Sequence, residues 1–146
     1  ITQNRAKGKN TFIFIDEIYL LFQHEYSANF LFTLWKRVRK YGAYATGITQ
    51  NVDDLLQSHT ARTMLANSEF LIMLSQSASD RAALAELLNI SDTQLSYVEN
   101  ADPGCGLMKF GGAFIPFVNS FPEDTELYKL MTTKPADREQ VKPNGV

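Results

Sequence analysis

The sequence lacks most features of secreted, metal-binding or membrane-spanning proteins. Its single cysteine, Cys105, excludes a framework of internal disulfide bonds and any metal cluster built from several cysteines. No apolar run approaches the roughly 18 residues of a membrane-spanning helix, and residues 1–10 lack the apolar core of a signal peptide. The 14 basic and 16 acidic residues nearly cancel, which excludes a field of one sign over the whole chain. We therefore expect a soluble protein, and the cysteine content fits a reducing compartment.

The chain does contain enough apolar sequence for one folded domain, because 45% of its 146 residues are hydrophobic. Residue 1 is not methionine, and we expect the chain to be part of a longer protein. Residues 1–10 are polar and basic and are expected to form a solvated lead-in. Residues 11–131 should form the folded part. Residues 132–146 combine prolines and charges without an aromatic residue, which predicts a disordered tail.

The most informative stretch is residues 11–17, TFIFIDE, where an apolar run ends on two adjacent carboxylates. Its β-branched and aromatic residues predict a strand buried on both faces, as in a parallel α/β sheet. Such a strand delivers Asp16 and Glu17 to its carboxyl end, where ligands bind in open α/β folds. One carboxylate could hold a metal ion and the other could activate a water. The pattern alone leaves a solvated acidic turn open as the alternative.

Further strands and helices alternate along the chain. We expect helices after Ser27, over residues 60–67, after Ser79, after Ser91 and over residues 123–131, and strands over residues 43–49, 70–74, 107–110 and 113–118. This alternation predicts an α/β fold with a mainly parallel sheet flanked by helices. The two glycines between the last two strands predict a β-hairpin, and Pro116 places it at the edge of the sheet.

Three stretches with polar side chains form a candidate site. Asp16 and Glu17 end the first strand, Arg39 and Lys40 end the following helix, and residues 49–50 end the second strand. Because the carboxyl ends of parallel strands lie on the same edge of a sheet, the carboxylates and Gln50 could contact one ligand. The basic cluster at residues 36–40 is read either as a solvated helix face or as part of this site.

Four segments together resemble a known family. They are TFIFIDE, WKRVRKYGAYATGITQN, LANSEFLIMLSQSASD and GCGLMKFGGAFIPF, running in order from about Asn10 to Phe121. They resemble the carboxyl-terminal ATPase domain of the VirB4/TraC-type conjugation proteins, which are traffic ATPases of type IV secretion systems related to the HerA/FtsK group. The resemblance implies that residues 11–131 are the carboxyl-terminal half of a RecA-like P-loop NTPase domain, whose parent uses ATP and Mg²⁺.

The resemblance also implies roles for particular residues. Asp16 matches the Walker B aspartate that holds magnesium, and Glu17 matches the adjacent glutamate that polarises the attacking water. Gln50 matches the polar residue that senses the γ-phosphate, with Thr49 beside it as a nucleotide-binding candidate. Arg39 and Lys40 match an Arg-Lys pair that serves the nucleotide or a subunit boundary, Arg39 as a catalytic and Lys40 as a nucleotide-binding candidate. The arginine finger stays open among the basic residues Arg37, Arg39, Lys40, Arg62 and Arg81.

The sequence departs from the family because it has no G-x-x-x-x-G-K-[ST] phosphate loop. In the family that loop lies upstream, so the chain should not hydrolyse ATP alone. The missing strand would lie between the strand ending at Gln50 and the strand at residues 70–74, and we expect the chain to close this vacancy by rearrangement or by pairing with another copy.

The resemblance implies an oligomeric parent, a hexameric ring on the cytoplasmic face of the membrane, with secretion components and DNA as partners. The alternatives are a fragment of a HerA/FtsK-like DNA translocase and a non-catalytic interaction module.

Overall fold

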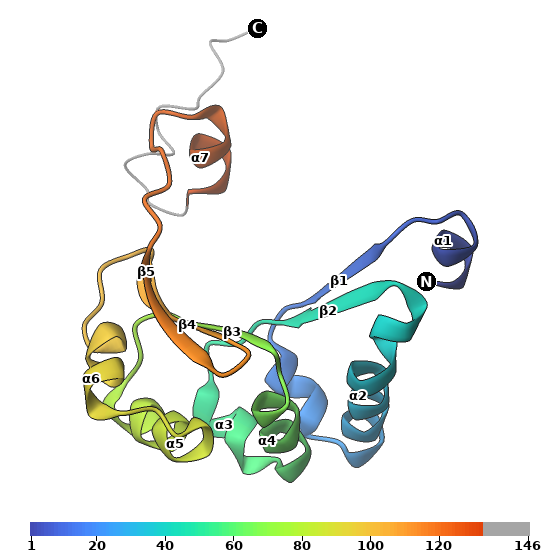
Figure 1. Cartoon of the computed structure of the whole chain (residues 1–146), viewed down its shortest axis with the longest axis horizontal. Helices are drawn as coiled ribbons and strands as arrows, with labels where there is room; N and C mark the ends of the chain where they lie inside the picture. Colours follow the sequence, from blue (N-terminus) through green and yellow to red (C-terminus); the bar gives the residue numbers. More distant parts are fainter. Residues whose placement is uncertain (133–146) are drawn as a thin grey trace, which may run out of the picture.

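The structure is a computed structural model that describes residues 1–132, so all of the expected disordered tail except Thr132 lies outside the described residues. Its α-helices are α1 (Thr2–Ala6), α2 (Glu25–Arg37), α3 (Val52–Gln57), α4 (His59–Ala66), α5 (Ala78–Leu88), α6 (Asp92–Leu95) and α7 (Glu126–Met131). Its 3₁₀ helices are η1 (Ile18–Phe22), η2 (Val38–Tyr41) and η3 (Ser96–Val98). Helices α2 to α5 lie together on one side of the strands (Figure 1). None of the helices in this part of the chain is long and apolar enough to cross a membrane.

A parallel pair of strands forms the first sheet. β1 (Thr11–Ile15) pairs with β2 (Ala43–Gly47) in a register that sets the first residues and the last residues of the two strands opposite each other. The chain passes between them through η1, α2 and η2. α2 begins at Glu25, two residues before the expected N-cap Ser27. Ser27 therefore lies inside the first turn of the helix, where its hydroxyl donates to the carbonyl of His24 at 3.0 Å.

An antiparallel meander forms the second sheet. It contains β3 (Phe70–Met73), β4 (Cys105–Phe110) and β5 (Ala113–Val118) in the order β3-β4-β5. The predicted hairpin is confirmed, with Gly111 at a φ of 56° in its turn. The predicted α/β architecture is confirmed as well, although parallel pairing within residues 1–132 is limited to β1 and β2.

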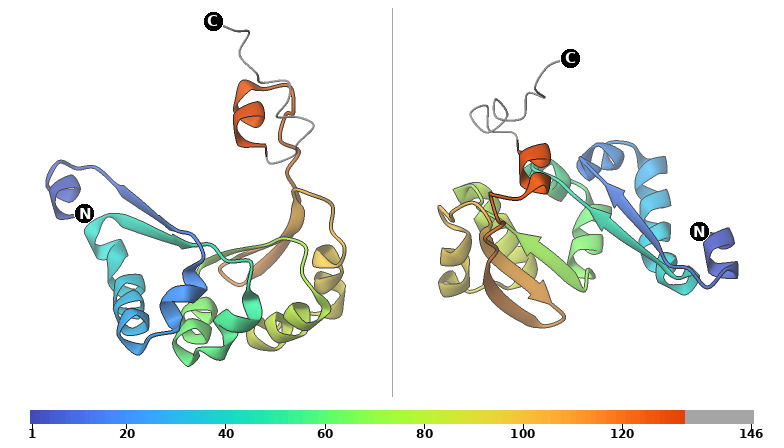
Figure 2. Two further views of the ribbon diagram at one scale, coloured as in Figure 1. Left: turned by 180° about the vertical axis from the view of Figure 1, so that it is seen from behind. Right: turned by 90° about the horizontal axis from the view of Figure 1, so that it is seen from above.

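The two sheets are separated at the position expected for the missing strand. β2 and β3 belong to different sheets, so within the described residues neither supplies the other with hydrogen bonds. Figure 2 shows the two sheets side by side over the helices, with this break between them. The free edges of β2 and β3 therefore face the place where the resemblance puts the phosphate-loop strand.

The core lies between the strands and the helical layer. One cluster packs under β3 and β4, and its buried members are Val52, Leu56, Met73, Leu84, Leu88, Ile90, Val98 and Leu107. A second cluster packs under β1 and β2, and its buried members are Ile18, Leu31, Leu55, Ala61 and Met64. Trp35 borders the second cluster and donates from Nε1 to the Ser68 hydroxyl at 3.3 Å. Both clusters lie on the same side of the strands.

The opposite face of the strands is open. Phe12 is 64% exposed and Phe14 is 69% exposed, and the ring of Phe12 stacks on that of Tyr44 at a centroid distance of 5.2 Å. Phe70 and Ile72 are exposed on β3 in the same way. The expectation that the first strand is buried on both faces is therefore wrong for the described residues, because their helical layer covers only one face.

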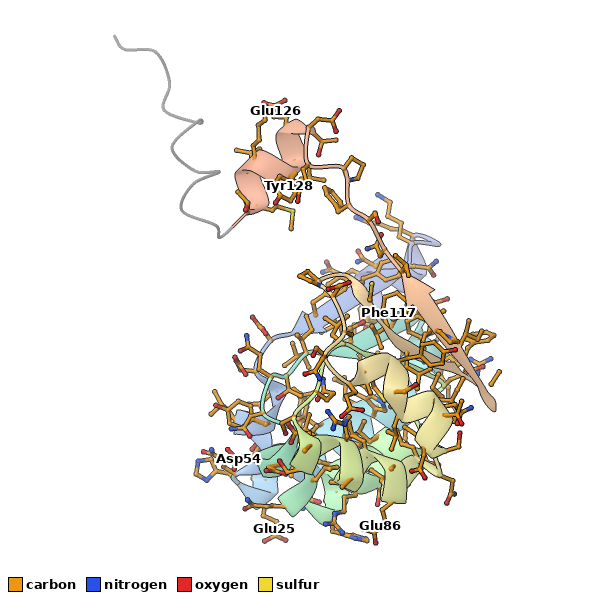
Figure 3. The ribbon with its side chains drawn as sticks, turned by 90° about the vertical axis from the view of Figure 1, so that its left-hand side faces the viewer. Glu25, Asp54, Glu86, Phe117, Glu126 and Tyr128 are labelled. Carbon is orange, nitrogen blue, oxygen red and sulfur yellow. The ribbon has the colours of Figure 1, made fainter. Side chains whose placement is uncertain are left out.

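Two short helices lie outside the helical layer. α1 replaces part of the expected lead-in and docks at the amino end of β1, where Asn4 Nδ2 donates to the Thr11 hydroxyl at 3.0 Å. α7 lies beyond the end of β5, away from the helical layer, as the positions of Glu126 and Tyr128 show (Figure 3). Its apolar side chains Leu127 and Leu130 are exposed.

Candidate functional site

Backbone hydrogen bonds hold the carboxyl ends of β1 and β2 together. Ile48 N donates to the carbonyl of Ile15 at 2.8 Å, and Ile18 N donates to the carbonyl of Ile48 at 3.0 Å. A Cβ on Gly47 would lie 2.6 Å from Cδ1 of Ile18, so glycine at this position allows η1 to pack directly on the end of β2. This packing fixes the turn that carries the two carboxylates.

Asp16 lies at the exposed end of β1 with one carboxylate oxygen occupied. Its Oδ1 accepts a hydrogen bond from the backbone N–H of Glu17 at 2.9 Å. Among the described residues its Oδ2 has no hydrogen-bond partner. The carboxylate is therefore oriented by the turn, and one oxygen remains available to a ligand.

Glu17 has an unusual backbone conformation. Its φ of 48° and ψ of 44° are left-handed, and among residues 1–132 the other non-glycine residues with positive φ are Asn89 and Asn100. Asparagine tolerates this region, whereas most other residues are disfavoured there by about 1 kcal/mol or more. Strain of this kind is concentrated at functional sites, so the backbone of Glu17 is independent support for a functional role. The sequence does not reveal this signal, because residue types do not determine φ.

Thr49 and Gln50 lie at the same edge as the carboxylates, because Gly47 at the end of β2 is opposite Ile15. The Thr49 hydroxyl accepts from Asn51 N at 3.1 Å, and the Asn51 side chain caps α3 by accepting from Asp54 N. Thr49 thus shapes the turn, while the Gln50 side chain is exposed and makes no hydrogen bond within residues 1–132. The structure brings together Asp16, Glu17, Thr49 and Gln50, as predicted from the strand ends.

Arg39 and Lys40 lie at the opposite edge of the sheet. They precede Gly42, whose carbonyl accepts from Thr11 N at 3.0 Å at the amino ends of the two strands. Five residues of strand, each adding about 3.3 Å, separate this edge from Asp16. A helix that joins two parallel strands starts at the carboxyl edge and ends at the amino edge, so its last residues cannot join the strand ends. The structure does not bring Arg39 or Lys40 to the carboxylates of the same chain.

Two of the other arginine-finger candidates are engaged. Arg62 donates from Nε to the carbonyl of Leu56 at 2.6 Å. Arg81 forms an ion pair with Glu99 at 2.8 Å and donates to the carbonyl of Gln76 at 3.1 Å. Arg37, Arg39 and Lys40 are exposed and have no such partner in the part of the chain that the structure describes.

The donor set at the carboxyl edge suits a hard cation. No group of three or more His, Cys, Asp or Glu residues within residues 1–132 is arranged to hold a metal ion. Mg²⁺ is nevertheless commonly bound through one or two carboxylates, with water and phosphate oxygens completing its shell. The free oxygen of Asp16 fits that requirement, whereas a site built wholly from protein ligands is not supported.

Comparisons with known proteins give a family match and a structural match for the chain. Residues 2–104 match the family model described as the TraG P-loop domain. The structure of VirB4 of Thermoanaerobacter pseudethanolicus matches 84% of this chain with a TM-score of 0.73 and 26% sequence identity, and the chain spans 34% of that protein. No curated protein matches. The likeness confirms the predicted resemblance to VirB4/TraC-type proteins and the partial RecA-like fold. The chain belongs to the TraG P-loop domain family.

Proposed function

We propose that this chain is the part of a conjugation or type IV secretion ATPase that carries the Walker B carboxylates. The observation that carries the proposal is the shared edge of β1 and β2, which presents Asp16, Glu17 and Gln50 together. The left-handed backbone of Glu17 supports it, because it marks a constrained residue where the resemblance puts a catalytic one. The match to the TraG P-loop domain and the likeness to VirB4 support the class of protein.

Each residue has a role that suits its place. Asp16 would hold Mg²⁺ through its free carboxylate oxygen, and Glu17 would orient the attacking water and accept its proton. The exposed amide of Gln50 would bind an oxygen of the γ-phosphate, and Thr49 would hold the turn that carries Gln50. Bound Mg²⁺ supplies charge neutralisation for phosphoryl transfer.

The phosphate-binding half of the site is absent from the sequence, so the activity belongs to the longer parent. There the nucleotide would lie between the carboxyl edge and the phosphate loop, whose strand would fill the break between β2 and β3. We propose a homo-oligomeric parent at the cytoplasmic face of the membrane. A nucleotide bound beside Asp16 could meet Arg39 or Lys40 only from a second copy, because these residues lie at the far edge of their own sheet.

The test is carboxylate-to-amide substitution in the full-length parent. Glu17→Gln should preserve ATP binding and lower turnover by about 100-fold or more, the usual loss when a general base is removed. Glu25→Gln is the matched control, since Glu25 is an exposed carboxylate in the first turn of α2. ATP binding is followed with a fluorescent nucleotide and turnover by phosphate release. Equal turnover in the wild type and the Glu17→Gln variant would remove Glu17 from the proposed role.

A further inference from the structure

The turn that carries Asp16 and Glu17 is held at both ends by one residue of the neighbouring segment. Ile48, which follows β2, donates from its N–H to the carbonyl of Ile15 at 2.8 Å, and its carbonyl accepts from the N–H of Ile18 at 3.0 Å. Ile15 and Ile18 flank the two carboxylate residues in the sequence. The backbone of Ile48 therefore fixes the two points between which this turn has to pass.

The backbone of Glu17 is bonded on both of its own sides. Its N–H donates to Oδ1 of Asp16 at 2.9 Å, and its carbonyl accepts from the N–H of Leu20 in η1 at 3.1 Å. Its dihedral angles are left-handed, with a φ of 48° and a ψ of 44°. The direction in which the Glu17 side chain leaves the turn is therefore set by the backbone of the turn.

Ile18, the next residue, is packed between the core and Gly47. It is 5% exposed and belongs to the same buried cluster as Leu31 and Leu55. On the strand side, a Cβ added at Gly47 would lie 2.6 Å from Cδ1 and 3.3 Å from Cγ2 of Ile18. Protein interiors are closely packed and transmit strain. A methyl group at residue 47 would therefore displace Ile18, and Ile18 is joined to Glu17 by a peptide bond.

The backbone conformation of Gly47 does not explain why glycine is present there. The glycines with positive φ within residues 1–132 are Gly8, Gly42, Gly104 and Gly111, so the conformation of Gly47 is open to other residues. Glycine weakens a strand because it has no side chain to pack, and it often marks a place where another segment approaches closely. At the end of β2 the segment that approaches is Ile18.

We infer that Gly47 is a positioning residue for Glu17. Its missing side chain lets Ile18 lie against the end of β2, and this contact sets where the Glu17 carboxylate is presented. The inference rests on the proposed function, in which Glu17 accepts a proton from the attacking water. A general base must lie within hydrogen-bond reach of the proton that it removes. A displacement of about 1 Å caused by a distant substitution can lower the rate by about 100-fold.

The experiment compares two glycine-to-alanine substitutions in the full-length parent. Gly47→Ala should lower kcat by about 10- to 100-fold and leave the Kd of a fluorescent ATP analogue unchanged. Adding Ile18→Val removes Cδ1, the nearest atom, and should restore most of kcat. Gly112→Ala is the matched control, because a Cβ there would have no atom of the described residues within 4 Å. The control should equal the wild type in kcat and in Kd.

A double-mutant cycle tests whether Gly47 acts through Glu17. If it does, Gly47→Ala should not lower the residual turnover of Glu17→Gln any further, because the base that it positions is already absent. Losses that multiply in the double variant would overturn the inference, since a purely structural defect adds to the loss of the base.

Three further results would also overturn the inference. They are equal kcat in Gly47→Ala and Gly112→Ala, no recovery with Ile18→Val, and loss of nucleotide binding in Gly47→Ala, which would assign Gly47 to folding. Glu17→Gln separates this failure from that of the proposed function. Wild-type turnover in Glu17→Gln would remove both, whereas a loss there with full activity in Gly47→Ala would remove only the positioning role.

Discussion

The two faces of the strands carry similar apolar side chains, but one face is covered by helices and the other is exposed. On the covered face Leu107 is fully buried and Met73 is buried beside it, whereas on the open face Phe12 and Phe14 remain largely exposed. Seen from above, the strands lie over the helices (Figure 2). Strands that are apolar on both faces are typical of sheets covered on both sides. The pattern of β1 is therefore that of a strand covered on both faces, although the helices of residues 1–132 cover one face.

Because of this difference, side chains on the covered face should determine the stability of the fold, and side chains on the open face should determine association with other molecules. Apolar side chains on the covered face stabilise the fold by about 25 cal/mol for each Å² removed from water. Side chains on the open face contribute little to folding, and exposed apolar patches of this kind mark surfaces that bind other proteins or aggregate. Equivalent substitutions on the two faces should therefore have different effects.

The largest expected effect is on the covered face. Leu107→Ala should lower the free energy of unfolding by about 2–5 kcal/mol, because it leaves a cavity in the cluster that contains Met73 and Val98. Leu74→Ala is the matched control, since Leu74 follows β3 and is half exposed. It should cost less than about 1 kcal/mol. Urea unfolding followed by circular dichroism measures both, and equal losses would contradict the difference between the faces.

A second effect is expected on association rather than stability. Phe14→Thr places a β-branched residue, which favours strands, on β1 and removes a largely exposed ring. The free energy of unfolding should change by less than about 1 kcal/mol. The weight-average mass from light scattering at high concentration should fall toward that of the monomer. A clean monomer for the wild type under the same conditions would show that the open face does not drive self-association.

Much of the fold can be predicted from the sequence, because the residue patterns that mark strand ends and helix starts are local. The run that ends on Asp16 and Glu17 predicted a strand end, and Ser91 predicted the start of a helix, where the structure has a capping box formed by Ser91 and Gln94. Parallel pairing then placed Gln50 at the same edge. The exposure of Phe12 could not be predicted, because a side chain's type does not tell which layer will cover it.

The errors have identifiable physical causes. Arg39 and Lys40 lie apart from the carboxylates because a helix that connects parallel strands ends at the opposite edge of the sheet from the carboxyl ends of the strands. α1 is not predictable from the sequence, because its five residues have no side-chain cap and bury none of their side chains. It is held by tertiary contacts of Asn4 and Arg5.

The smallest expected effect concerns the strained residue where β1 ends. Ile18, which follows Glu17, is buried in the covered face, so packing there holds Glu17 in its left-handed conformation. Glu17→Asn should raise the free energy of unfolding by up to about 1 kcal/mol, because asparagine adopts this conformation more readily. The reverse change, Asn89→Glu, should lower it by a similar amount at another left-handed position. Thermal unfolding compares the two variants. A loss of stability in both would mean that the Glu17 side chain, rather than its backbone, determines the energy of this turn.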